Sequence, residues 1–111
     1  MMETQGGLSI VLTTLPSQED AQKIAETLVK EHLVACASFL DGVFSAYFWN
    51  DNLEKALEVL LWLKVPDKTL AAAKERLQAL HPYEVPEILT LRALEVNQAY
   101  LAWAIKATRQ E

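Results

Sequence analysis

The sequence predicts an α+β fold: a four-stranded antiparallel sheet with two helices on one face and an extra helix at the C-terminal end. Three observations carry this prediction. Extended and helical hydrophobic periodicities follow one another in the order strand, helix, strand, strand, helix, strand, helix. Asp, Asn, Gly or Pro residues mark most of the boundaries at which the periodicity changes. Two right-handed crossover units in this order form the split βαβ arrangement, which places both main helices on one face.

The first strand and the first helix are short and clearly punctuated. Residues Leu8 to Leu12 form an aliphatic run that leads into Thr-Thr-Leu-Pro and predicts a buried strand. Ser17 can cap the following helix, and Asp20 resembles the reciprocal partner of a capping box. We expect this helix to end near His32 and to cover the sheet with one apolar face. The apolar positions are Ala21, Ile24, Ala25, Leu28 and Leu33.

A long hairpin is predicted next. Val34 to Leu40 is apolar with small residues, Asp41-Gly42 supplies a bend or bulge, and Val43 to Trp49 continues the extended pattern. The turn Asn50 to Asn52 contains residues that tolerate left-handed backbone, so it should return the chain into Leu53 to Val65. This second arm has strand composition and no helical stripe, which favours a strand over a helix.

Prolines mark both ends of the second helix, which is followed by the last strand and the last helix. Asp67, after Pro66, can cap a second helix that stops at His81-Pro82. Ile88 to Leu94 is a strand, and Asn97 caps a final helix. The apolar faces are Leu70, Ala73, Leu77 and Leu80 in the second helix, and Tyr100, Trp103, Ala104 and Ala107 in the last one.

The length of the hairpin predicts an oligomer. Typical strands run about 5–6 residues, and each of these arms is about twice as long. Tyr47, Phe48, Trp49 and Trp62 cannot all be buried within one chain of this size. Long exposed edges with aromatic side chains promote association, so we expect the arms to pair with neighbouring subunits.

Composition narrows the class of protein. The 111 residues are 51% hydrophobic and 23% charged, which fits one folded domain (1–111) and excludes disorder, while no apolar run is long enough for a membrane span. The net charge is −5 without a Lys/Arg stripe, so we expect no nucleic-acid partner. One cysteine and an N-terminus without a leader pattern predict a cytoplasmic protein without an internal disulfide.

The segment from His81 to Ile88 is the stretch richest in chemistry. It places an imidazole, a phenol and two carboxylates around two prolines, which fix their own φ and exclude helix from the residues before them. A rigid turn of this kind can hold a ligand with little loss of backbone entropy. It can equally serve only to stop a helix and start a strand.

The chain resembles the CutA divalent-ion tolerance proteins from about Ile10 to Trp103. The most specific match is the whole stretch from His81 to Ile88. The other matches in the same register are Thr14, Ala21, Ile24-Ala25, Leu33 to Cys36, Ser45-Ala46-Tyr47 with Trp49, Glu58-Val59 with Lys64, and Tyr100 to Trp103.

The resemblance implies a ferredoxin-like βαββαβ subunit with a long β-hairpin, in a homotrimer similar to the PII signalling proteins. It also implies cytoplasmic occurrence and a link to tolerance of copper and other divalent cations. Some family members carry a cysteine and a second histidine where this chain has Thr13 and Leu80. Of the three candidate metal ligands, this chain keeps His81.

The candidate ligand cleft consists of Lys64, Trp49, Tyr83, Glu87 and Tyr47, and the candidate metal ligand is His81. The imidazole could bind Cu²⁺ or another divalent cation together with the carboxylate of Glu87 or Glu84. One histidine is too few within a subunit, so further ligands would have to come from a cleft between subunits.

Most of these residues also have a purely structural interpretation. His32 can serve the helix dipole, and Cys36 can be a small buried hydrophobe. Lys64 can form an ion pair with Glu87 across the sheet. The tryptophans and tyrosines can be interface and core residues rather than ligand contacts.

Three functional classes follow. The first is a trimer that binds a divalent cation or a small ligand, with no obligatory cofactor. The second is an enzyme with His81 and Glu87 as acid and base, but the chain lacks a nucleophile elbow, a metalloprotease helix and a phosphate loop, so we predict no enzyme. The third is a PII-like signalling or scaffold trimer without specific metal binding.

Overall fold

The computed structural model describes residues 6–109, so most of the N-terminal stretch considered for a leader lies outside it. Its elements are β1 (Leu8–Leu15), α1 (Gln18–Lys30), β2 (Cys36–Trp49), β3 (Asn52–Pro66), α2 (Asp67–Leu80), β4 (Leu89–Arg92) and α3 (Gln98–Ala107). All pairs in the sheet are antiparallel, in the order β2-β3-β1-β4. The predicted ferredoxin-like α+β fold with its C-terminal helix is therefore confirmed. None of the helices within residues 6–109 has the length and apolar content needed to cross a bilayer.

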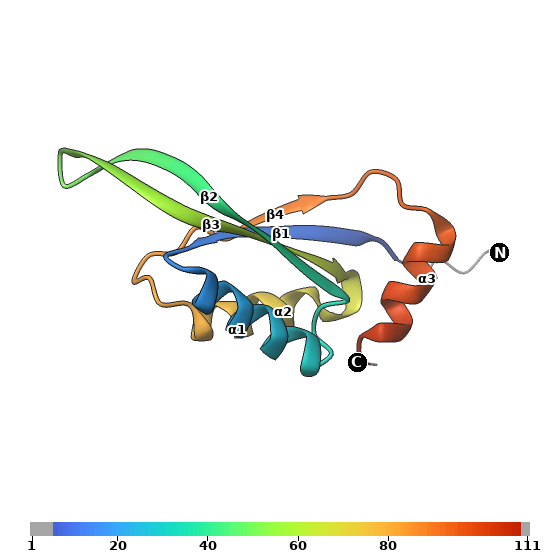
Figure 1. The fold of residues 1–111 in the computed structure, drawn as a ribbon. Helices are drawn as coiled ribbons and strands as arrows, with labels where there is room; N and C mark the ends of the chain where they lie inside the picture. The colour runs from blue at the N-terminus through green and yellow to red at the C-terminus, as the bar shows by residue number, and fades with distance from the viewer. Residues whose placement is uncertain (1–5, 110–111) are drawn as a thin grey trace.

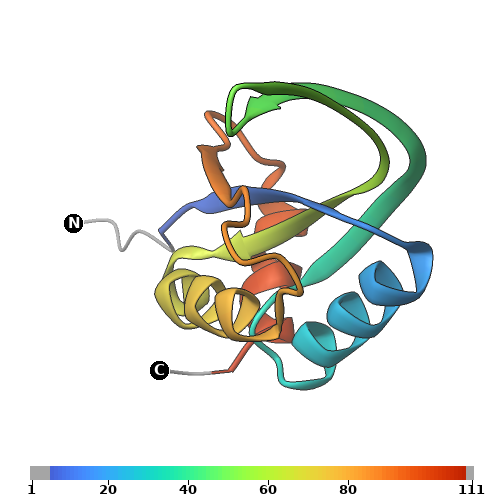
Figure 2. The same cartoon turned by 90° about the vertical axis from the view of Figure 1, so that its left-hand side faces the viewer.

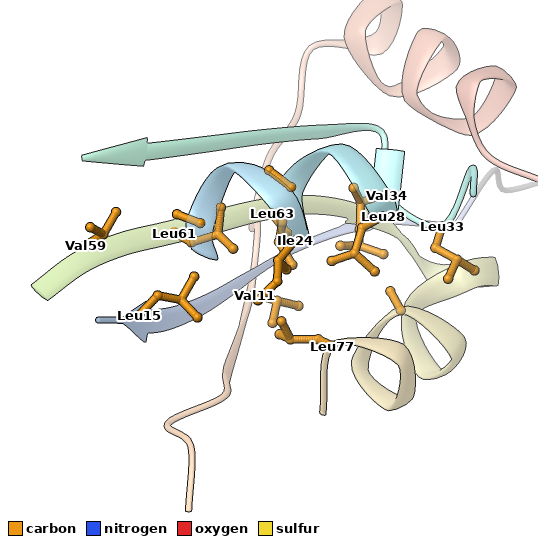
Figure 3. Packing of buried hydrophobic residues seen from close by; sticks show 14 residues of the cluster. Val11, Leu15, Ile24, Leu28, Leu33, Val34, Val59, Leu61, Leu63 and Leu77 are labelled. Carbon is orange, nitrogen blue, oxygen red and sulfur yellow. The ribbon is translucent and has the colours of Figure 1, made fainter. Parts of the chain in front are cut away.

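The main core lies between one face of the sheet and the helices α1 and α2, which run side by side (Figures 1 and 2). Alternate residues of β1 and β3 point into it, as the period of a strand requires. Figure 3 shows these side chains meeting those of the helices, and the fully buried ones include Val11, Leu15, Leu28, Leu61, Leu63 and Leu77. A smaller cluster of Leu8, Ala35 and Ala104 anchors α3 near the start of β1.

Strands β2 and β3 form the predicted long hairpin, which projects beyond the rest of the molecule (Figure 1). Strand β1 pairs with β3 only between Leu15, opposite Val59, and Leu8, opposite Pro66. The residues of β3 before Val59 therefore pair with β2 alone. We call this projecting part, residues 43–58, the arm. The bend expected at Asp41-Gly42 is a register shift between Leu40 and Val43.

Left-handed backbone closes the hairpin as predicted. Asn50 and Asp51 have φ values of 51° and 66°, and Trp49 pairs with Asn52 across the turn. Both residue types tolerate this conformation better than most. The last strand is shorter than the predicted Ile88 to Leu94, since only Leu89 to Arg92 pair with β1.

The three predicted helix caps differ in outcome. Ser17 caps α1, because its Oγ accepts a hydrogen bond of 3.1 Å from the backbone N–H of Asp20. The prediction that Asp67 caps α2 is wrong. Its carboxylate instead accepts from the Gly7 N–H at 2.8 Å and pairs with the guanidinium of Arg92, so it joins three separate segments. Asn97 occupies the cap position of α3 without a side-chain cap bond.

His32 serves a different helix from the one expected. It follows α1 with a φ of 60°, and its Nδ1 lies 3.2 Å from the carbonyl oxygen of Ala107, the last residue of α3. The backbone N–H of Arg109 donates to the His32 carbonyl at 2.8 Å. His32 thus ties the end of α3 to the end of α1.

The two caps provide a matched comparison of stability. We expect Ser17→Ala to lower the free energy of unfolding by about 1 kcal/mol, because the Asp20 N–H loses its acceptor. Asn97→Ala should cost clearly less, because its side chain makes no cap bond. Urea denaturation followed by circular dichroism measures both. Equal losses in the two variants would contradict this account of α1.

Candidate functional site

The candidate site lies where β1 ends and β3 continues with β2 as its only partner. Helix α2 ends at Leu80, and His81 is its C-cap in extended conformation, as the following proline requires. The segment 81–88 then passes below the base of the arm and leads into β4 (Figure 1). Glu58 is the first residue of β3 beyond its pairing with β1. The 81–88 segment therefore lies beside the carboxylate of Glu58, at the position where the sheet loses β1.

Both ring nitrogens of His81 are engaged within the chain. Nε2 lies 2.8 Å from Oγ1 of Thr13 on β1, and Nδ1 accepts a hydrogen bond of 3.2 Å from the backbone N–H of Tyr83. Because Nδ1 is an acceptor, the proton of the neutral ring is on Nε2 and is donated to Thr13. The imidazole, which is buried, thus joins the strand to its own loop.

The Tyr83 hydroxyl donates to Oε2 of Glu58 at 2.7 Å. The rings of Tyr83 and His81 lie beside each other, with centroids 5.2 Å apart and a tilt of 40°. Only 8% of Glu58 is exposed, so this bond satisfies a carboxylate that has lost most of its water. Burial, followed by the bond to Glu58 and its negative charge, raises the pKa of Tyr83, which stays a protonated donor.

Burial also lowers the pKa of His81 below its ordinary value of 6.5. The interaction with the Thr14 backbone and the charges of Asp20 and Glu58 oppose this shift, but desolvation is the largest cause. His81 is therefore neutral at pH 7. A neutral imidazole is the form in which histidine binds a metal.

The remaining predicted site residues are spread over the loop and the arm. Tyr47 lies on β2 opposite Glu54, and its phenol makes a minor contribution to the raised pKa of Tyr83. Glu84 and Glu87 are exposed on the loop, and Trp49 is exposed at the far end of the arm. The structure thus groups His81 and Tyr83 with Tyr47 nearby, and it separates them from Trp49.

Lys64 is far from this group within one chain. It lies six residues after Glu58 on the same strand, which corresponds to roughly 20 Å at 3.3 Å per residue. Its Nζ donates to Oγ of Ser38 at 2.7 Å. Within residues 6–109 the ion pairs are Arg76 with Glu31 and Arg92 with Asp67, so the pair of Lys64 with Glu87 that we considered does not form in the single chain.

One chain does not assemble a metal site by itself. Residues 6–109 contain no group of three or more His, Cys, Asp or Glu side chains that could hold a metal ion. An open apolar hollow of about 240 Å³ between α1 and β2 contains none of the predicted site residues. Its lining is Ala25, Glu26, Val29, Lys30 and Ala37.

Sequence reasoning did not assign Thr13 and Glu58 to the site. In the sequence Thr13 is only a departure from the pattern of the family, yet in the fold its hydroxyl accepts from the histidine. Glu58 had a usable signal, because it is a carboxylate in the otherwise apolar run Leu57 to Leu63. A charge in a strand that is otherwise buried needs a partner, which here is Tyr83.

Comparison with known proteins gives consistent matches over most of the chain. A divalent-cation tolerance protein CutA of Thermus thermophilus is 44% identical over 94 residues, which are 85% of this chain and 91% of that protein. The corresponding protein of Pyrococcus horikoshii is 40% identical over 101 residues, 91% of this chain and 98% of that one.

The three-dimensional comparison agrees. The crystal structure of CutA1 from Oryza sativa superposes with a TM-score of 0.92 at 31% identity, over 98% of this chain and 100% of that one. Residues 9–107 match the family model described as CutA1 divalent ion tolerance protein. The resemblance inferred from the sequence is confirmed, and the chain belongs to the CutA1 family of divalent ion tolerance proteins.

Proposed function

We propose that this protein is a homotrimeric divalent-cation tolerance protein that binds copper, another divalent cation or a small ligand in clefts between its subunits. It acts by binding rather than by catalysis, and it works in the cytoplasm. The cleft consists of Lys64, Trp49, Tyr83, Glu87 and Tyr47, with His81 as the metal ligand. The family supplies the link to divalent cations. The exposed apolar side chains of the arm are the observation that supports assembly into a trimer.

Large apolar side chains on the arm are exposed in the single chain. Phe48 is 75% exposed, Leu57 72% and Phe44 63%, and Leu53 faces the same way. Phe44 pairs with Leu57 and Phe48 with Leu53, so the four side chains share one face of the hairpin. Between the two pairs this face carries Ala46 and Lys55. An exposed face with four large apolar side chains of this kind marks a protein interface. Two further copies of the chain are the partner that fits the family and that three-fold symmetry allows.

The sheet has a second uncovered surface on the side away from α1 and α2. Helix α3 covers only one end of it (Figure 1). Leu40, Leu89 and Leu91 on this side are at least half exposed. Packing of these sheets against each other in a trimer would bury them together with the arms. It would also bring groups from one subunit next to the 81–88 segment of another.

A PII-like signalling or scaffold trimer is the second candidate function. One observation favours it: both nitrogens of His81 already have partners inside the chain. A metal at Nε2 would have to displace the Thr13 hydroxyl. Titration with copper separates the two functions.

The assembly is tested by light scattering after gel filtration. We expect three subunits at micromolar concentration, and Leu57→Glu should shift the mass towards one subunit, because a charge on the apolar arm face cannot be buried without a partner. Val29→Glu places the same charge on an exposed position of α1, outside the arm, and should leave the mass unchanged. A monomeric wild type would refute the trimer.

Copper binding is tested by calorimetric titration of the wild type and of His81→Gln. We expect the substitution to weaken Cu²⁺ binding by about tenfold or more, because the ion loses its nitrogen ligand. His32→Asn is the matched control: it removes the other histidine at a backbone position that asparagine tolerates. Equal affinity of the wild type and His81→Gln would exclude His81 as a ligand and favour the signalling trimer.

The neutral state of His81 predicts a pH dependence of stability. Its folded pKa is lowered, so below pH 6.5 the unfolded chain binds a proton that the folded chain does not. Stability should therefore decrease as the pH falls through 6.5 towards the lower folded pKa. Urea denaturation at a series of pH values measures this, and His81→Gln should make the curve flatter in that range. An unchanged slope in the variant would show that other groups cause the dependence.

A further inference from the structure

Lys64 is an isolated positive charge on an apolar surface. In the register of the sheet it lies between Ile10 on β1 and Cys36 on β2, and side chains directly opposite each other share a face. The next row on this face is Leu12, Trp62 and Ser38. This is the side of the sheet away from the main core. Among the paired residues of the two rows, Lys64 alone carries a charge.

Within the part of the chain that the structure describes, the contacts of Lys64 and Ser38 leave two hydrogen-bond donors without acceptors, one on each residue. Nζ donates to Oγ of Ser38 at 2.7 Å, lies 3.7 Å from Sγ of Cys36, and sits 5.2 Å from the ring centroid of Trp62. An ammonium has three N–H donors, so one remains. Ser38 accepts from Lys64, and no acceptor for its own hydroxyl proton lies within residues 6–109.

Tyr100 on α3 adds a further group beside this cluster. Burial raises the pKa of its phenol, and the neighbouring Cys36 raises it further. Tyr100 stacks at a tilt on Trp103, with ring centroids 5.5 Å apart. The cluster therefore has an ammonium and hydroxyl groups in the middle and aromatic rings around them. It contains no carboxylate.

The missing counter-charge becomes important in the trimer proposed above, on which this inference rests. In the single chain Lys64 is half-buried, and water can satisfy the remaining donors. Association through the open face would remove that water. A buried ammonium without an anion would oppose association, because its lost hydration is not compensated. The seam between subunits therefore needs one negative charge next to Lys64.

We propose that Lys64 and Ser38 bind the carboxylate of a small organic acid, whose apolar part lies against Trp62. A single ammonium balances one negative charge, which favours a monocarboxylate over a phosphate dianion. The free Lys64 N–H and the Ser38 O–H can each donate to one carboxylate oxygen. The indole and the neighbouring aliphatic side chains suit an apolar body. Lys64 belongs to the cleft proposed above, so this inference names a ligand class for that cleft. Within one chain Lys64 lies six residues along β3 from Glu58, which Tyr83 contacts.

The test is a calorimetric titration of the full chain with sodium benzoate in Tris chloride, with benzyl alcohol as the uncharged probe. We expect the wild type to bind benzoate at least about tenfold more tightly than benzyl alcohol, because only the acid makes charge-assisted bonds. Lys64→Met should lose the preference for benzoate. Ser38→Ala should weaken benzoate binding by several-fold and keep the preference. Lys23→Met, which removes an exposed lysine on α1, should behave like the wild type.

Light scattering on the same samples separates this proposal from the trimer. A trimeric wild type that does not bind benzoate, or binds it equally well without Lys64, overturns the carboxylate site alone. A Lys64→Met trimer that dissociates more easily, in a protein that never binds benzoate, would mean that a carboxylate of a neighbouring subunit takes this place, which also overturns it. A monomer that binds benzoate through Lys64 supports the site and refutes the trimer.

Discussion

The difference in length between β3 and its neighbour β1 is the constraint on which the rest of the structure depends. Strand β1 stops opposite Val59, and β3 extends further with β2 as its sole partner. At the step, Glu58 meets the loop that returns from α2, and Tyr83 satisfies its carboxylate. Beyond the step, the hairpin has no helix beneath it, so its apolar side chains stay exposed. One mismatch thus produces both the polar cluster and the apolar arm.

The polar cluster consists of Thr13, Glu58, His81 and Tyr83, and its hydrogen bonds hold the 81–88 loop against the sheet. His81 links β1 to the loop backbone, and Tyr83 links the loop to β3. The prolines on both sides reduce the conformational entropy that these bonds must overcome. The resulting site is rigid, with a neutral imidazole and a protonated phenol. Its geometry is therefore set by the fold and does not depend on a bound ligand.

The sequence predicted local structure well where local forces decide it. The cap at Ser17, the left-handed turn at Asn50 and Asp51, and the bulge after Leu40 were all confirmed, because each depends on residues close together in the chain. Asp67 was predicted wrongly for the opposite reason. Its preference for a helix cap was overridden by Gly7 and Arg92, which only the folded sheet brings to it.

The sequence by itself determined the order of the elements, the long hairpin and the stretch from His81 to Ile88 as the centre of the candidate site. The tertiary structure alone decided which residues meet there. It brought Thr13 and Glu58 to the loop and left Lys64 beside Ser38 at the other end of the strand. Periodicity and turn chemistry act over a few residues and can be read along the chain. Strand register sets the contacts between distant residues, and it is fixed only when the whole sheet packs against its helices.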